Sequence, residues 1–179
     1  MRIIAGRYGG RRLSVPKGRD IRPTSDKVRG AIFNTLGGML DLEDVNVLDV
    51  FCGTGALGLE ALSRGAVQIT FIDKHKASLG LARENAQCLD VMEQCRFQLG
   101  DAKTVQLNQE FDLIFLDPPY AQDLVVPVLN NLIARDVLKT GSICVIETEK
   151  HASLDLNDCF EVLKAKEYGD TLVTYLRYR

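Results

Sequence analysis

Residues 47–58 read VLDVFCGTGALG. The apolar run before the glycines predicts a strand that is buried on both faces of a parallel sheet. Gly53 and Gly55 allow a tight turn and let the backbone come close to a ligand, because neither carries a side chain. The residues that follow form a helix whose first amide groups point back at that ligand. The stretch therefore predicts a turn that binds a nucleotide-like molecule.

The amino-acid sequence of this turn is compatible with two ligand classes. Gly53, Gly55 and Gly58 match the dinucleotide fingerprint, and Asp73 follows Gly53 at the distance expected of a ribose-binding acid. Asp49, however, lies inside the strand, where its carboxylate would repel a pyrophosphate. S-adenosylmethionine carries an ammonium and a sulfonium, and a nearby anion favours both. A strand–helix turn that binds nothing is the third alternative.

Length and composition point to one globular unit with an ordinary core. The chain has 179 residues, of which 46% are hydrophobic and 26% charged, and a domain of this size buries roughly 70% of its unfolded surface. No apolar run approaches a membrane span, and the first residues lack the apolar core of a signal peptide. The five cysteines are odd in number and show no Cys-x-x-Cys spacing. We therefore expect free thiols, no metal and a cytoplasmic protein.

The charges are divided unevenly along the chain. Residues 1–29 contain nine Lys or Arg and two acidic residues, a net charge of +7. The rest of the chain has 13 basic and 22 acidic residues, and the whole chain has a net charge of −2. A basic arm on an acidic body is typical of nucleic-acid binding. The alternative is a hairpin whose charges only face solvent.

The first forty residues are expected to form an extension that packs on the remaining 41–179 core. Two strands, 2–5 and 11–15, flank a glycine-rich turn and predict a hairpin. A helix follows, capped by Thr24 or Ser25 and ending near Leu36.

From residue 45 onward, strand and helix patterns alternate, which predicts right-handed crossovers and a mostly parallel sheet. The tail contains two strand-like runs with no room for a helix between them, so they should pair antiparallel. This plan is that of a Rossmann-like, class I methyltransferase fold with a seven-stranded sheet. The expected strands are 45–50, 67–72, 95–99, 111–116, 141–147, 160–166 and 171–177, and the expected helices of this core are 56–64, 75–89 and 122–134.

Acidic residues follow four successive strands, at Asp49, Asp73, Asp101 and Asp117. In such a sheet the ligand lies at the carboxyl ends of the strands. The Asp73 carboxylate suits ribose hydroxyls, and Asp101 suits the adenine amino group. For any single one of them, capping a helix is the alternative role.

The segment Asp117-Pro118-Pro119-Tyr120 indicates the chemistry. Two prolines stiffen the strand end and remove two amide donors. The Asp117 carboxylate and the Pro118 carbonyl can accept the two protons of an exocyclic amino group on a base, which turns the nitrogen lone pair toward a methyl donor. Tyr120 offers a ring on which the base can stack. The alternative is a stiff loop with a buried tyrosine.

Together, residues 47–58, 71–75, 100–102 and 117–120 resemble amino-methyltransferases with an Asp/Asn-Pro-Pro-aromatic motif. The N-terminal residues, from Arg2-Ile-Ile-Ala-Gly through Arg22-Pro-Thr-Ser-Asp-Lys-Val-Arg29 to Phe33-Asn34, are similar to the RsmD family of bacterial 16S rRNA guanine-N2 methyltransferases. The resemblance implies catalytic roles for Asp117, Pro118, Pro119 and Tyr120. It implies S-adenosylmethionine contacts by Thr24, Asp49, Phe51, Gly53, Gly55, Asp73, Asp101 and Ala102. The basic arm implies RNA contacts by Arg7, Arg11, Arg12, Lys17, Arg22 and Arg29.

One residue departs from this resemblance: Gly30 stands where a glutamate is expected in the family. The implied partner is 16S rRNA, within a small ribosomal subunit or an assembly intermediate, and the protein is expected to be a monomer with no membrane contact. The residues after Tyr120 leave no room for a target-recognition domain, which favours RNA over DNA. Cys52 lies in the cofactor turn and is no candidate for a covalent nucleophile.

Three other functions stay open at this point. One is an amino-methyltransferase acting on adenine N6 or cytosine N4 of DNA, or on another RNA. A second is a ribosome-assembly factor that keeps S-adenosylmethionine as a structural ligand. The third is a dehydrogenase that uses the same glycine turn for a nicotinamide cofactor.

Overall fold

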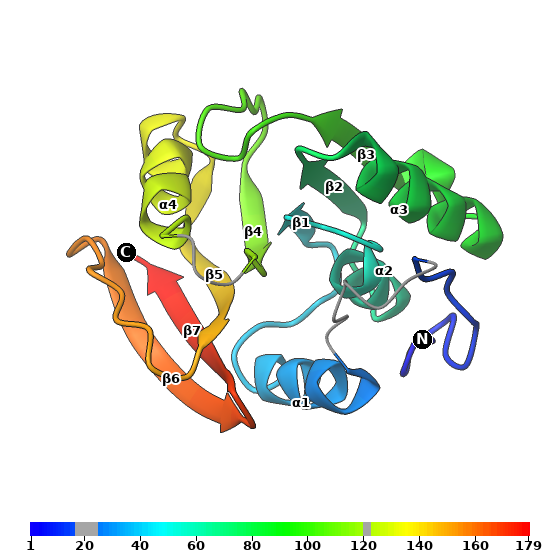
Figure 1. The fold of residues 1–179 in the computed structure, drawn as a ribbon, viewed down its shortest axis with the longest axis horizontal. Coiled ribbons are helices and arrows are strands. Elements are labelled where there is room, and N and C mark those ends of the chain that lie inside the picture. Colours follow the sequence, from blue (N-terminus) through cyan, green and yellow to red (C-terminus); the bar gives the residue numbers. More distant parts are fainter. Residues whose placement is uncertain (17–24, 120–122) are drawn as a thin grey trace.

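A computed structural model of the chain describes residues 1–16, 25–119 and 123–179. Within these residues one seven-stranded sheet runs through the molecule in the order β3-β2-β1-β4-β5-β7-β6 (Figure 1). The first five strands in this order pair in parallel, and β7 pairs antiparallel with both β5 and β6. The bounds are β1 Asn46–Val50, β2 Gln68–Asp73, β3 Cys95–Leu99, β4 Phe111–Leu116, β5 Leu138–Glu149, β6 Phe160–Tyr168 and β7 Thr171–Tyr178.

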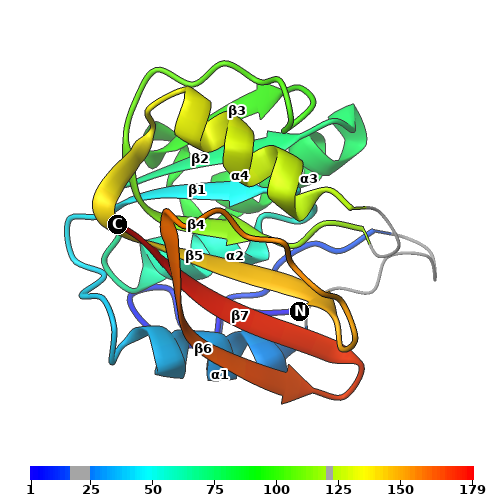
Figure 2. The ribbon, with the colours of Figure 1, turned by 90° about the vertical axis from the view of Figure 1, so that its left-hand side faces the viewer.

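Helices cover both faces of this sheet. The four α-helices of the described chain are α1 Asp26–Leu36, α2 Ala56–Ser63, α3 Lys76–Leu89 and α4 Val125–Ala134, and a short 3-10 helix, η1 Met92–Gln94, precedes β3. One buried cluster joins α1, α2 and α3 to one face of the sheet, and a second joins α4 to the other face. In Figure 2 the strands lie side by side across the page, and α4 lies in front of the parallel strands. The predicted parallel sheet with its antiparallel C-terminal hairpin is confirmed.

The strand order reverses direction at β1. The chain proceeds outward from β1 to β2 and β3, and then returns to place β4 on the other side of β1. A crevice forms at such a switch point, at the carboxyl ends of the strands, because the flanking crossovers leave on opposite faces. The turn after β1 and the segment after β4 therefore lie beside each other.

The predicted N-terminal strand hairpin is wrong. The segment has an isolated antiparallel bridge between Arg2 and Arg12 and a few backbone hydrogen bonds around it, from Ile3 N–H to Arg11, from Gly10 N–H to Ile3 and from Leu13 N–H to Met1, but no regular strand ladder. The reason lies in α2, because its Glu60 carboxylate accepts the amide N–H of Ile4 at 2.7 Å and that of Ala5 at 3.1 Å. The amides of Ile4 and Ala5 bind a helix side chain and not a partner strand, so the pairing does not continue past Ile3 as a regular ladder.

Glu60 is also the centre of a buried ion network. Its side chain has no exposed surface, and its Oε1 lies 2.8 Å from Nε of Arg64. Arg29 of α1 is likewise fully buried, with its Nε 3.8 Å from Glu60 and its Nη2 2.9 Å from Asp26. The network ties the N-terminal segment and α1 to α2. The predicted RNA contact of Arg29 is therefore wrong, because burial takes its guanidinium out of reach of any phosphate.

Among the described residues, no helix has both the length and the apolar character needed to span a lipid bilayer.

We expect Glu60→Gln to destabilise the protein by about 3–5 kcal/mol, because it leaves Arg29 in the interior without its full counter-charge. Urea unfolding monitored by circular dichroism measures the loss in the free energy of unfolding. Glu93→Gln, which changes an exposed glutamate on η1, is the matched control and should change stability by less than about 0.5 kcal/mol. Equal stability of the two variants would show that the network does not hold the N-terminal segment.

Candidate active site

The glycine turn joins β1 to α2 in a conformation that few other residues adopt. Gly53 and Gly55 have φ angles of +53° and +74°, in the left-handed region that favours glycine. No atom outside the adjacent residues lies closer than 3.9 Å to a Cβ built at Gly53, so its outer face is open. A Cβ at Gly58 would lie 2.6 Å from the Phe71 ring. Gly53 therefore suits ligand approach, whereas Gly58 permits close packing of α2 on β2.

Asp49 holds this turn from inside β1. Its Oδ2 accepts the amide N–H of Gly58 at 2.9 Å, in the first turn of α2. The side chain is 2% exposed. Burial raises the pKa of Asp49 well above its usual range against the opposing effect of the Gly58 N–H, and the carboxylates of Asp117 and Asp73 raise it further. The site thus concentrates negative charge, which a cationic ligand would relieve.

Asp73 ends β2 and shapes the other side of the same turn. Its Oδ2 accepts the Gly53 amide at 3.2 Å, and its Oδ1 accepts the His75 amide at 2.8 Å. It borders a cleft of about 470 Å³ that also contains Asp49 and Gly53. Each of its oxygens keeps a second lone pair, so the carboxylate can still accept ribose hydroxyls.

A smaller cavity of about 60 Å³ adjoins the cleft. Phe51, Asp73 and Lys74 line both spaces, and Asp101 and Ala102 line only the smaller one. Phe51 has a φ of +60°, an unusual angle for a bulky residue, and strain of this kind is concentrated at functional sites. Asp101 is exposed and caps its own turn, with Oδ1 accepting the Lys103 amide at 2.9 Å. The cavity offers an aromatic ring and an acid where the adenine was expected.

The segment after β4 lies in the large cleft. Asp117, Pro118 and Pro119 line it together with Asp49 and Gly53, as the register of Val50 beside Leu116 requires. The predicted amino-group acceptors and the predicted cofactor turn therefore share one space. Tyr120, predicted to stack on the base, lies outside the described residues.

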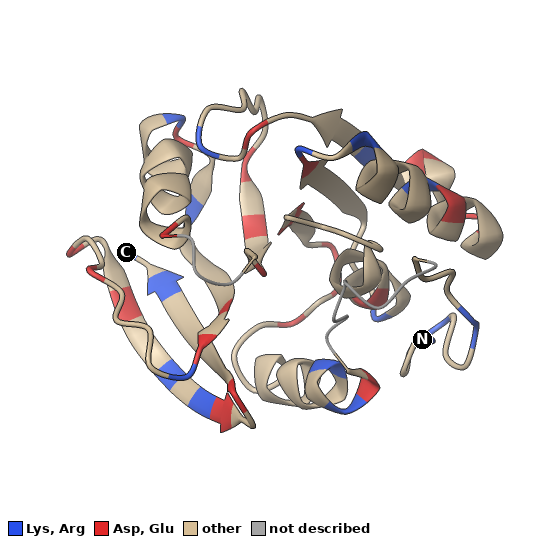
Figure 3. Cartoon of the chain, in the orientation of Figure 1, with Lys and Arg blue, Asp and Glu red and all other residues tan. Residues whose placement is uncertain are grey.

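The predicted RNA-binding residues separate into three groups. Arg7, Arg11 and Arg12 are exposed on the N-terminal segment, and Arg11 donates to the Cys88 carbonyl. Figure 3 shows Lys and Arg along this segment and acidic residues on the strands. Arg29 is buried, as described above. Lys17 and Arg22, like the predicted cofactor contact Thr24, lie outside the described residues.

Glu147 of β5, Tyr168 of β6 and Thr171 of β7 are among the cleft residues that were not predicted from the sequence. Glu147 lies at the end of the predicted fifth strand, and this position, which it shares with the acids of the other strands, is the signal for it in the sequence. Tyr168 and Thr171 come from the C-terminal hairpin, and only the folded sheet brings them to the cleft.

Cys52 lies in the turn, but its thiol is unsuited to nucleophilic attack. Burial raises its pKa far above the usual range, and the neighbouring Asp49 and Asp73 raise it further. Among the residues that the structure describes, no three His, Cys, Asp or Glu side chains are placed to hold a metal ion.

Comparison with known proteins agrees with this geometry. The chain is 35% identical to Ribosomal RNA small subunit methyltransferase D of Haemophilus influenzae, over 100% of this chain and 93% of that protein. It is 31% identical to the uncharacterized methylase RP545 of Rickettsia prowazekii, over 99% and 98% of the two chains. Its fold is similar to that of the Escherichia coli protein yhhF, with a TM-score of 0.89 and 28% identity over 100% and 98% of the chains.

The fold and the site thus define a methyltransferase of the S-adenosylmethionine-dependent class. More narrowly, the chain belongs to the RsmD family, whose model, described as "Conserved hypothetical protein 95", matches residues 1–177.

Asp49→Asn should raise the melting temperature of the ligand-free protein and weaken S-adenosylmethionine binding by about tenfold or more. The amide keeps an acceptor for the Gly58 N–H but removes the buried charge. Because the pKa of Asp49 is raised by folding, wild-type stability should fall as the pH rises from the ordinary aspartate pKa to the raised one. The variant should lack this part of the slope.

Thermal melts across pH and calorimetric titration with S-adenosylmethionine measure both effects. Asp155→Asn, at an exposed position, is the control. An Asp49→Asn variant that binds S-adenosylmethionine as tightly as the wild type would contradict a role for this charge.

Proposed function

We propose that this protein transfers a methyl group from S-adenosylmethionine to the exocyclic N2 of a guanine in small-subunit rRNA. One observation supports it above all: Asp117, Pro118 and Pro119 line the same cleft as the glycine turn and Asp73. An acceptor for amino protons and a turn for a nucleoside-like methyl donor therefore face one volume. The relatives named as small-subunit rRNA methyltransferases support the choice of substrate.

The residues of the cleft fit S-adenosylmethionine by their chemistry. Asp49, Asp73 and Asp117 supply negative charge for a ligand with an ammonium and a sulfonium. Asp73 suits the ribose, and Phe51, Asp101 and Ala102 suit the adenine. When bound, the ligand supplies an electrophilic methyl group on sulfur.

The remaining task of the protein is placement and charge stabilisation. The Asp117 carboxylate and the Pro118 carbonyl accept the two amino protons, which fixes the base and directs the nitrogen lone pair into the cleft. Orientation of this kind contributes roughly 7–11 kcal/mol in well-aligned reactions. Asp117 also lies where positive charge develops on the nitrogen, and this stabilises the transition state more than the ground state. No strong base is needed, because the methylated amino cation loses its proton readily.

Transfer of labelled methyl from S-adenosylmethionine tests the proposal. Small-subunit particles, naked 16S rRNA and duplex DNA are offered in parallel, and the labelled nucleoside is identified by mass. N2-methylguanosine from rRNA or from the particle is the expected product. Label in DNA alone would overturn the substrate. Bound S-adenosylmethionine with no label in any acceptor would overturn the enzymatic role and favour an assembly factor.

Asp117→Ala should reduce kcat by about 100-fold to 1000-fold, the usual cost of removing one group that stabilises the transition state. S-adenosylmethionine affinity should change little. The matched control is Asp123→Ala, which changes an exposed aspartate shortly after the same segment. Single-turnover methylation and calorimetry separate the two quantities. Full methylation by Asp117→Ala would remove Asp117 from the reaction.

RNA binding is proposed to depend on the exposed arginines of the N-terminal segment. Log affinity should fall with log salt, and each phosphate that the protein neutralises adds about 0.7 to the magnitude of the slope. Arg7→Ala combined with Arg12→Ala should therefore flatten the slope by about 1.4. The control Lys164→Ala with Arg177→Ala changes two basic residues of β6 and β7. Filter binding across salt concentrations gives the slopes, and equal slopes for wild type and arm variant would exclude the arm from RNA contact.

A further inference from the structure

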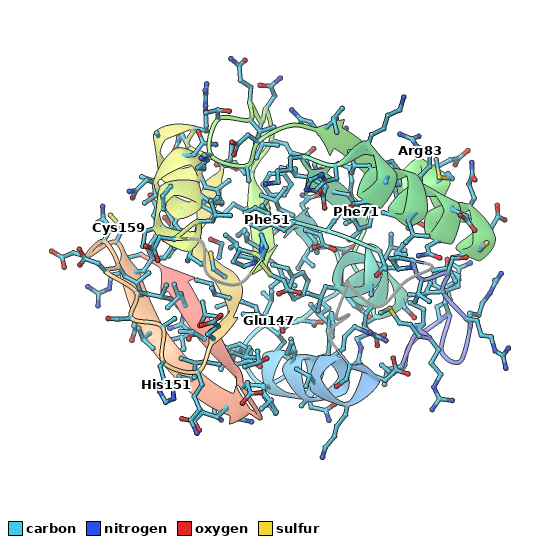
Figure 4. The ribbon with its side chains drawn as sticks, in the orientation of Figure 1. Phe51, Phe71, Arg83, Glu147, His151 and Cys159 are labelled. Atoms are coloured by element: carbon cyan, nitrogen blue, oxygen red, sulfur yellow. The ribbon has the colours of Figure 1, made fainter. Side chains whose placement is uncertain are left out.

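A second carboxylate borders the cleft beside Asp117. Glu147 lies on β5, is 3% exposed, and lines the cleft together with Asp117, Pro118 and Pro119. Figure 4 shows Glu147 of β5 and Phe51 of the turn after β1, both in the central region of the molecule. The reaction proposed above gives this buried acid no role.

Strand register places Glu147 next to Asp117. Leu116 of β4 pairs in parallel with Ile146 of β5. The next residues along the chain, Asp117 and Glu147, therefore lie side by side. Phe115 and Val145 both belong to the core cluster beneath α1, α2 and α3. Because side chains alternate along a strand, Asp117 and Glu147 share the face of those residues. They are neighbours on the same side of the sheet.

The position of Glu147 is on the side of the cleft away from the cofactor turn. The order of strands places β4 and β5 between β1 and β7. Beyond Glu147 the cleft is lined by Tyr168 and Thr171 of the C-terminal hairpin. A base whose amino group is held at Asp117 would therefore extend its adjacent edge toward Glu147.

That edge differs between the bases. Guanine carries N1–H directly beside its N2 amino group, so it offers a row of donors. Adenine has an unprotonated N1 beside its amino group, and cytosine has an unprotonated N3. A carboxylate accepts from the guanine edge and repels the lone pair of the other two.

We propose that Glu147 is the specificity-determining residue for guanine, accepting the N1–H of the target base while Asp117 accepts from its N2 amino group. The inference rests on the proposed function and names the group that selects the base. The geometry behind it is the adjacency of the two acids on one face of the sheet at one cleft. Tyr168 and Thr171 complete the substrate side of this cleft.

The test replaces the target guanine by 2-aminopurine, which keeps the N2 amino group and has no N1–H. Small ribosomal subunits are reconstituted from rRNA that carries either base at the nucleotide found by the methyl-transfer assay. Wild-type enzyme should prefer guanine by about 100-fold or more in kcat/KM, as expected when a carboxylate meets an unprotonated ring nitrogen in place of an N–H donor. In Glu147→Gln the side-chain amide can turn and donate to the unprotonated N1, so the preference should shrink at least about tenfold.

Two further variants make the readout specific. Glu149→Gln changes an exposed glutamate two residues along β5 and should keep the wild-type preference. Glu147→Asp keeps the charge and should lower the guanine rate while preserving the preference. The absence of guanine O6 from 2-aminopurine affects every enzyme alike, so the comparison is between the ratios and not between the rates.

The outcomes separate the two proposals. If wild-type enzyme forms no N2-methylguanosine, the proposed function fails and the inference fails with it. If it does, but Glu147→Gln lowers both rates by the same factor, Glu147 only supports the structure and the inference alone is overturned. If Glu147→Gln does not fold, the wild type and Glu147→Asp decide the inference about Glu147. Equal wild-type rates on guanine and 2-aminopurine overturn the inference, and a guanine preference that Glu147→Asp retains supports it.

Discussion

The hydrogen bond from the Gly58 amide to the buried Asp49 carboxylate is the interaction on which the site depends. It joins the middle of β1 to the first turn of α2 and so fixes the shape of the turn between them. Asp73 holds the same turn from β2 through the Gly53 amide. Two acids from neighbouring strands thus set a backbone loop that has few side chains of its own to hold it.

This arrangement places a carboxyl group in the interior, where its charged form is unfavourable in an empty protein. Burial and the nearby carboxylates both raise the pKa of Asp49, and the Gly58 amide opposes them. The charged form of Asp49 gains stability when a cation binds, so folding of the empty protein favours a neutral side chain at residue 49, whereas binding of a cation favours a negative one.

Helix α2 connects this turn to the N-terminal segment. Its first turn is held by Asp49, and four residues after its start Glu60 accepts two amides of that segment and pairs with Arg64. Any shift of α2 therefore moves the cofactor turn and the basic arm together. The N-terminal segment packs on the same helix that borders the cleft, so in the proposed function its exposed arginines would hold RNA phosphates near the site without a separate domain.

Much of this structure follows from local sequence patterns, and the exceptions have physical causes. The periodicity of apolar residues predicted the helices and strands of the core, because each element buries one face or both. The glycine turn and Asp117 could be recognised because each belongs to a short motif of consecutive residues. Arg29 was misjudged because a basic residue in a basic segment gives no sign of its partner, Glu60, thirty-one residues away. The N-terminal strands were misjudged for the same reason, and Tyr168 and Thr171 reach the cleft only through strand pairing.

The division of charge in the sequence takes on a meaning in the folded chain. Acids at the ends of β1, β2, β4 and β5 make the cleft attractive to a cationic ligand and to the amino edge of a base, but they repel the phosphates of RNA. A nucleic acid therefore needs attraction from elsewhere on the surface to bring a base into such a cleft. The exposed arginines of the N-terminal segment supply positive charge outside the cleft, where it does not neutralise the acids. In the proposed reaction the chain binds RNA through basic residues of the N-terminal segment and performs the chemistry in an acidic cleft. The net charges of +7 for residues 1–29 and −9 for the remainder agree with this division.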